Sequence, residues 1–266
     1  MKSYLFLVIC LVASICFCQE KTYNEKELSI TKWIDGTLLS PIDNEKSTLA
    51  ILIAGSGPTN RNGNQNFLKN NSLKKLAEGL TNNGIATFRY DKRIVKQIQH
   101  GKVDKDMMFD DFVSDASAVI DFLKEKYTYS KIYVIGHSQG SLVGMLAAKG
   151  KANGFISLAG AGQNIGDVLV EQVTKMAPKL GEEAQKVVDK LKEGKTIYLF
   201  YPQVSKSEAR LLKEANEKAI LTIIENMNHV LFEIKGDDLE NSKSYNESFR
   251  SISPQLIISI TEFIKS

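Results

Sequence analysis

Residues 132–140 read IYVIGHSQG, an apolar run that ends in the pattern G-x-S-x-G. The residues that follow, 141–148, are mostly small and apolar, which is typical of the start of a buried helix. A serine between two glycines on a sharp strand-to-helix turn is a nucleophile elbow. The turn holds the serine backbone in a strained conformation that larger neighbours would clash with. The pattern therefore predicts that Ser138 Oγ stands clear at the end of a buried strand.

Length and composition indicate one globular domain. The chain has 266 residues, enough to bury a sizeable core. Its hydrophobic content of 43% and charged content of 24% are ordinary for a soluble protein. The net charge of +3 is small and the basic residues are scattered, whereas nucleic-acid binding needs a basic face or stripe. We therefore expect no nucleic-acid partner; the composition leaves the oligomeric state open.

The N-terminus has the pattern of a secretory signal peptide over residues 1–19, so we expect the mature domain to span 20–266. A short positive start precedes an apolar run, residues 4–15, that is too short to cross a bilayer comfortably. The mature domain is expected in the secreted or periplasmic space, without membrane contact; a retained membrane anchor is the alternative. It would have neither disulfide nor thiol nucleophile, because all three cysteines lie in this segment: Cys10, Cys16 and Cys18.

Strands and helices are expected to alternate along the rest of the chain. Such alternation implies a mostly parallel sheet with helices on both faces. The first two strands flank a turn at Asp35 and Gly36 and predict a hairpin. Besides the strand before Ser138, the expected strands are 28–31, 37–40, 48–54, 84–88, 154–159, 196–201 and 220–224. The expected helices are 72–80, 109–127, two segments within 165–191, 205–216 and 254–264.

A serine hydroxyl needs a base within hydrogen-bond reach, and histidine is the usual one. The chain has three histidines. His229 follows the last expected strand, and for a G-x-S-x-G elbow the chain order is serine, acid, then histidine. It is the predicted base, with a surface histidine in a turn as the alternative. His137 adjoins the serine and is expected to point elsewhere, and His100 lies in a polar loop.

An acyl-transfer site also needs backbone N–H groups aimed at the developing oxyanion. One is expected from Gln139, directly after the nucleophile, and the other from the loop after an early central strand. That loop begins Gly55-Ser56-Gly57, where glycines let the backbone approach a ligand closely. We expect Ser56 N–H to be the second oxyanion donor; a plain glycine turn is the alternative.

Taken together, these segments resemble the secreted bacterial esterase-like branch of the α/β-hydrolase superfamily, related to serine aminopeptidase-like and dienelactone-hydrolase-like domains. The resemblance implies an α/β-hydrolase fold with a small helical cap, shortened near the penultimate strand. It also implies hydrolysis of a small-molecule carboxylic ester, with Ser138 as nucleophile and His229 as general base and acid. The matching segments are 50–64 (AILIAGSGPTNRNGN), 84–93 (GIATFRYDKR), 109–127, 132–140, 154–161 (GFISLAGA) and 223–230 (IIENMNHV).

The chain departs from this family most at the catalytic acid. Family members carry an aspartate after the penultimate strand, but the sequence has no aspartate from Lys190 to Gly236. Glu208 is the nearest carboxylate and the candidate acid, although a solvated helix face is the alternative. Asn60 and Asn62 are a second departure, because family members usually have acidic residues in this glycine-rich loop. Residues 94–97 are a third, because family members often have a glycine-rich stretch there. Further candidate acids are Asp167, Glu214, Glu217 and Glu225.

Three hypotheses follow. The first is a serine hydrolase acting on small acyl esters through an acyl-enzyme. The second is a degenerate hydrolase that binds a ligand without efficient turnover, and the third is a damaged product that does not fold stably. We expect no metal, because the histidines are few and far apart, and no nucleotide cofactor. Residues 55–57 lack the rest of the dinucleotide pattern and the lysine of a phosphate loop.

Overall fold

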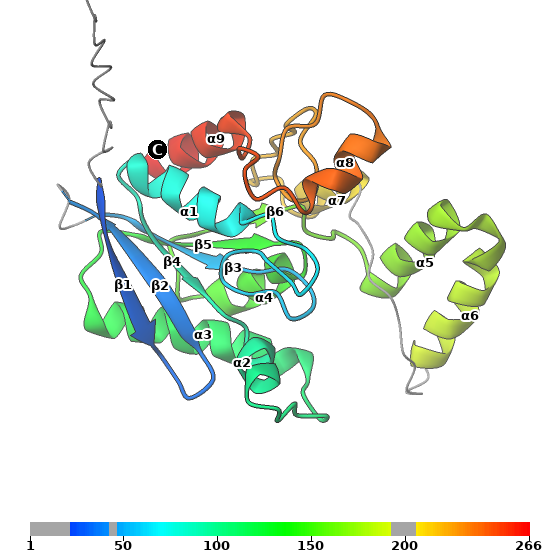
Figure 1. Cartoon of the computed structure of the whole chain (residues 1–266), viewed down its shortest axis with the longest axis horizontal. Helices are drawn as coiled ribbons and strands as arrows, with labels where there is room; N and C mark the ends of the chain where they lie inside the picture. The colour runs from blue at the N-terminus through cyan, green and yellow to red at the C-terminus, as the bar shows by residue number, and fades with distance from the viewer. Residues whose placement is uncertain (1–21, 43–46, 193–205) are drawn as a thin grey trace, which may run out of the picture.

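A six-stranded sheet lies at the centre of the computed structural model, which describes residues 22–42, 47–192 and 206–266 (Figure 1). The strand order is β1-β2-β4-β3-β5-β6. The β1–β2 and β2–β4 pairs are antiparallel, and the other three are parallel. The mostly parallel sheet and the hairpin of the first two strands are confirmed, but the turn lies at 30–34, and Asp35 and Gly36 are already part of β2. The strands are β1 Tyr23–Ser29, β2 Asp35–Pro41, β3 Leu49–Ile53, β4 Ala86–Tyr90, β5 Ile132–His137 and β6 Gly154–Leu158.

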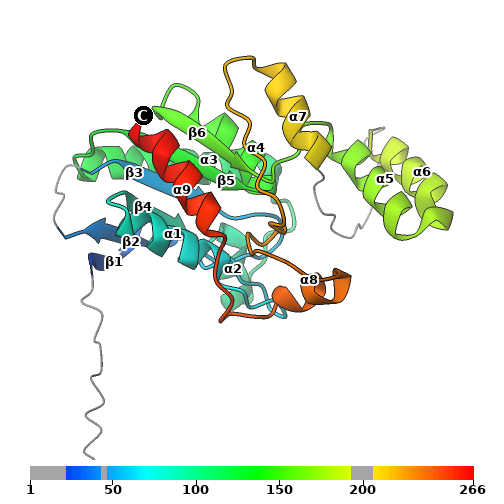
Figure 2. The same ribbon diagram turned by 90° about the horizontal axis from the view of Figure 1, so that it is seen from above.

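Helices cover both faces of the sheet, as expected (Figure 2). One face packs against α3 and α4, and the other packs against α1 and α9. The spacing of apolar residues explains this, because α3 turns Val119, Ile120 and Leu123 to the sheet and all three are 0% exposed. These helices are α1 Ser72–Asn82, α3 Phe109–Lys126, α4 Gln139–Ala148 and α9 Pro254–Lys265.

The helices expected within 165–191 form an antiparallel pair that stands to one side of the sheet (Figures 1 and 2). They are α5 Ile165–Met176 and α6 Gly181–Lys192, joined by a short 3-10 turn, Pro178–Leu180. The remaining helices are α2 Arg93–Gln99, α7 Lys206–Ala215 and α8 Asp238–Ser244. No helix among the described residues has both the length and the apolar character to cross a membrane.

The expected strand at 220–224 is wrong, because this segment is irregular. Its side chains are largely in solvent: Ile220 is 74% and Ile223 38% exposed, and Ile224 packs against the core. A short apolar run does not by itself distinguish a strand from an extended loop; a strand also needs a neighbour's free hydrogen-bonding edge. The expected strand 196–201 and signal peptide 1–19 lie outside the described residues.

Candidate active site

Ser138 lies in a sharp turn between β5 and α4, with φ 54° and ψ −123°. A non-glycine residue rarely adopts a positive φ, and such strain collects at functional sites. The Ser138 N–H donates to the Leu158 carbonyl at 2.8 Å, which ties the turn to the end of β6. The predicted elbow is confirmed.

Close backbone packing explains the two glycines of the elbow. A Cβ on Gly136 would lie 2.2 Å from the Gly140 carbonyl oxygen, and a Cβ on Gly140 would lie 2.4 Å from the carbonyl oxygen of Ile53. Both distances are far inside van der Waals contact, and backbone atoms cannot move aside cheaply. The glycines therefore let α4 start directly against β3, which holds Ser138 at the end of the sheet.

The glycine-rich loop after β3 lies beside the nucleophile. A Cβ on Gly55 would lie 3.1 Å from Ser138 Cβ. Ser56, the next residue, is held through its carbonyl, which accepts hydrogen bonds from Thr59 Oγ1 at 2.7 Å and Gln65 Nε2 at 3.0 Å. Gln139 begins α4, where the first N–H groups have no acceptor within the helix. The structure thus brings the segments of both predicted oxyanion donors next to Ser138.

The two asparagines that depart from the family pattern act as acceptors within this loop. Asn60 Oδ1 accepts from the N–H groups of Asn62 at 3.0 Å and Asn64 at 3.1 Å. Asn62 Oδ1 accepts from Arg89 Nε at 3.2 Å. A carboxylate oxygen could accept the same bonds, so the amides preserve the hydrogen bonding of the loop while removing negative charge.

Arg61 ties the same loop to the end of β4. Its N–H donates to Asp91 Oδ1 at 2.7 Å, and its Nη2 lies 2.6 Å from Asp91 Oδ2. The side chains are only 16% and 18% exposed, so the pair is better shielded than a surface ion pair. This tether fixes the far end of the glycine-rich loop.

His229 lies on the loop between α7 and α8, and its ring faces that of His137. The two ring centroids are 4.9 Å apart. His137 Nε2 donates to the His229 backbone carbonyl at 2.7 Å. The expectation that His137 points away from the site is therefore wrong, because its ring supports the histidine loop. Among the described contacts, no hydrogen bond joins Ser138 Oγ to His229.

The Nδ1 atom of His229 is buried, and no described residue binds it. Burial, followed by the neighbouring His137, lowers the pKa of His229 to about 3. A buried polar atom normally has a partner, and Nδ1 is the atom that a triad acid binds. The described residues thus leave the acid position open on the histidine ring.

The candidate acids can now be placed. Glu208 lies in the first turn of α7, and its side chain is outside the described part of the chain. Asp167 lies in α5, 3.3 Å from Lys192 Nζ in an exposed ion pair. The other three carboxylates, Glu214, Glu217 and Glu225, are exposed. The prediction for Glu208 therefore stays untested.

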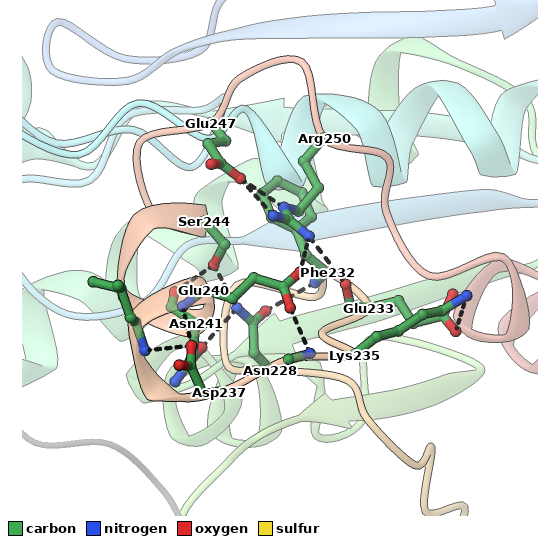
Figure 3. Close-up of polar contacts among 12 residues, drawn as sticks. Asn228, Phe232, Glu233, Lys235, Asp237, Glu240, Asn241, Ser244, Glu247 and Arg250 are labelled. Carbon is green, nitrogen blue, oxygen red and sulfur yellow. Dashed lines mark hydrogen bonds and ion pairs between the residues drawn. The ribbon is translucent and has the colours of Figure 1, made fainter.

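A polar network behind the histidine loop fixes its shape (Figure 3). Asn228 Nδ2 donates to Asn241 Oδ1 at 3.0 Å and to Ser244 Oγ at 2.8 Å, both in α8. Asn228 Oδ1 accepts from the Phe232 N–H at 2.9 Å. No sequence pattern singled out Asn228 or α8, yet the bonds between them fix the residue directly before His229.

Arg250 extends the network toward α9. Its guanidinium lies 2.7 Å from Glu240 in α8 and 2.7 Å from Glu247 (Figure 3). The three side chains are between 22% and 29% exposed, so they are partly shielded from water. The network joins α8 to the segment before α9 and leaves the histidine loop few ways to move.

The comparison with protein families agrees with this geometry. Residues 70–231 match the family Hydrolase_4, described as serine aminopeptidase, S33. The chain belongs to this family of α/β-hydrolases. The matched region contains both Ser138 and His229. The mixed sheet with helices on both faces is the α/β-hydrolase fold that the resemblance implied.

Individual relatives of this α/β-hydrolase are distant. Esterase EstD of Thermotoga maritima is 28% identical over 184 residues, which cover 66% of this chain and 43% of that esterase. Among solved structures, a dienelactone hydrolase from Anabaena variabilis has a TM-score of 0.42 at 18% identity, covering 53% of this chain and 65% of its own. The Pyrococcus furiosus esterase Pf2001 has a TM-score of 0.41 at 19% identity, and the match covers 64% of this chain and 60% of the esterase.

Proposed function

We propose that this α/β-hydrolase is a serine hydrolase that cleaves carboxylic esters of small acyl substrates. Ser138 attacks the ester carbonyl, and its proton passes to His229, which then protonates the leaving alcohol. Water hydrolyses the acyl-enzyme by the reverse sequence. The N–H groups of Ser56 and Gln139 stabilise the oxyanion. The strained conformation of Ser138 carries the proposal, and the esterase named among the relatives supports the ester class.

The proposal also needs a catalytic acid. We assign it to Glu208, on its position after the family's aspartate site. An imidazole without an oriented acid is a poor base: losing the acid costs about 10⁴ in rate in serine proteases, while the oxyanion hole still contributes. A protein without a working acid therefore keeps slow turnover rather than none.

Covalent labelling tests the nucleophile directly. A fluorophosphonate probe should add to the purified protein, and tandem mass spectrometry should locate the adduct on Ser138. Ser138→Ala should stay unlabelled, while Ser114→Ala, on the exposed face of α3, should label normally. An unlabelled protein that unfolds in a single cooperative thermal transition would contradict the proposal, and that transition would also exclude an unstable, damaged product.

The open position at His229 Nδ1 favours a second candidate function, a degenerate hydrolase that binds its ligand without efficient turnover. Two measurements separate the candidates. A binding protein should show the same low esterase rate with and without Ser138→Ala, and the same affinity for an ester analogue in both forms. An enzyme should lose at least about 10³ in rate in that variant.

We also propose that residues 1–19 are removed as a signal peptide and that the domain works in the secreted or periplasmic space. The short apolar run supports this. N-terminal sequencing of the mature protein should find a start at or near Glu20. An intact N-terminus in a membrane fraction would instead show a retained anchor.

A further inference from the structure

Lys92 is buried at the centre of the site, although it is a charged residue. It lies two residues after the end of β4 and immediately before the first turn of α2, and it is 5% exposed. Its Nζ lies over the ring of Phe112 in α3, 4.6 Å from the centroid. Among the described ion pairs, none includes Lys92. Burying an ammonium without a carboxylate is costly, and such groups often serve a function.

The ammonium makes two hydrogen bonds, and they go to the two sides of the proposed oxyanion hole. Nζ donates to the Gly55 carbonyl at 2.9 Å and to Gln139 Oε1 at 3.1 Å. Gly55 belongs to the glycine-rich loop after β3, and Gln139 is the first residue of α4. One buried side chain therefore joins two segments that are far apart in the sequence.

The bond to Gly55 has a consequence for Ser56. The Gly55 carbonyl and the Ser56 N–H belong to one planar peptide unit, in which they point in opposite directions. A cation fixed on the carbonyl side therefore turns the N–H to the opposite side. The cation also polarises the peptide, which makes its N–H a stronger donor.

We propose that Lys92 is a positioning residue that locks the Ser56 and Gln139 oxyanion donors into one arrangement. The inference rests on the proposed function, because it assigns those two N–H groups to the oxyanion. Lys92 touches no reacting atom. It acts through the Gly55–Ser56 peptide and through the side chain of Gln139.

The surroundings of Lys92 make its charge sensitive to pH. Burial lowers the pKa of Lys92 to about 8. The titratable groups that share its small cavity are Tyr90 in β4 and Asp115 in α3. Asp115 is bound by Arg93 at 2.6 and 2.8 Å, so its charge is already compensated. The other lining side chains are apolar: Ile53, Ala54, Phe112 and Val143.

The first test compares Lys92→Met with Lys96→Met by steady-state ester hydrolysis. Lys96 lies one turn further along α2 and binds Asp35 at 2.7 Å, so it is a matched control away from the loop. Lys92→Met should lower kcat by about 10² with little change in KM, because the oxyanion forms only in the transition state. In a profile of kcat against pH, the wild-type value should fall above pH 8, and this alkaline limb should be missing in Lys92→Met. Unchanged kcat and an unchanged limb would overturn the inference.

The second test does not need activity or a variant that folds. In ¹⁵N-labelled wild-type protein, the amide resonances of Ser56 and Gln139 should titrate together between pH 7 and 9. Amides that stay fixed over this range would overturn the inference, even in an active enzyme. If the wild type is inactive and unlabelled by the fluorophosphonate, the proposed function fails, while co-titration of the two amides would still support the role of Lys92.

Discussion

His137 Nε2 donates a 2.7 Å hydrogen bond to the backbone carbonyl of His229, across 92 residues of sequence. The residue before the nucleophile thus holds the loop that carries the proposed base. This contact involves no carboxylate. The position of the histidine loop consequently depends on the elbow and on α8. The ionisation of the His229 ring depends in addition on which group, if any, binds its Nδ1 atom.

Replacing His137 with Phe keeps an aromatic ring but removes the donor. We expect kcat/KM to fall about fivefold, because a lost hydrogen bond of roughly 1 kcal/mol loosens the histidine loop. Steady-state kinetics and thermal unfolding would measure both effects. His100→Phe, at the exposed end of α2, is the control. Full activity in His137→Phe would show that the bond does not position the loop.

The pH profile of kcat/KM reports on the acid position. With Nδ1 unpartnered, the pKa of His229 is lowered to about 3, so the ring is neutral and able to accept a proton throughout the range above it. Without a carboxylate at Nδ1, kcat/KM should stay flat from pH 7.5 down to about pH 5. A fall with a midpoint between pH 6 and 7 would instead mean that a carboxylate raises the pKa of the imidazole.

Glu208→Gln identifies that carboxylate if it is present. Should Glu208 be the acid, the variant should lose about 10³ to 10⁴ in kcat and any acidic limb in the profile. Glu214→Gln, at the exposed end of the same helix, is the matched control. Equal kinetics in both variants would remove Glu208 from the mechanism.

Gly140→Ala should disrupt the elbow far more than an ordinary glycine substitution does. Its Cβ would meet the Ile53 and Ala54 carbonyl oxygens at 2.4 and 2.6 Å. We expect a loss of about 3 kcal/mol in unfolding free energy, together with loss of probe labelling. Gly150→Ala is the control, because Gly150 has φ +70° with nothing within 4 Å of its Cβ and so reports backbone strain alone. Similar losses in the two variants would contradict the steric explanation.

The charge of Lys92 should cost stability at neutral pH. Its folded pKa of about 8 is below the usual 10.5, so the unfolded chain binds the proton more tightly between these values. The penalty is full below pH 8 and is relieved as the pH rises toward 10.5. The unfolding free energy of the wild type, measured by urea against Lys92→Met, should therefore gain about 2.5 kcal/mol from pH 7 to pH 10. A constant difference would show that the lysine is not buried as an ammonium.

Strong apolar periodicity made most of the fold predictable. The runs that became β3 and β5, and the stripe of α3, are long and regular, and the structure confirms them. By contrast, α2 and α8 have seven residues each, and the side chains buried in them, Gln97 and Ser244, are polar. A side-chain cap holds the start of α8, where Asp237 accepts from the N–H groups of Leu239 and Glu240, and this depends on where the loop lies.

At the site, only residues that belong to a local motif or a fixed chain order could be predicted from the sequence. The G-x-S-x-G turn predicts its own backbone, and chain order leads to His229. Lys92 binds Gly55 and Gln139 in other segments of the chain, and Asn228 binds side chains of the following helix, α8, and no spacing rule reveals either residue. One signal was available for Lys92: it lies two residues after a strand that is buried along its whole length, where a lysine is already close to the core.

The elbow at Ser138 is enforced by steric fit at Gly136 and Gly140, and this fit needs neither a base nor an acid. Selection for folding therefore acts on the two glycines, whereas selection for catalysis acts on the serine. Any descendant that must fold keeps the glycines, whether or not it catalyses, whereas only a descendant that uses the hydroxyl needs the serine. Saturation mutagenesis scored separately for abundance and for turnover would divide the motif along that line. The glycines therefore report on the fold, and Ser138 alone reports on the proposed catalysis.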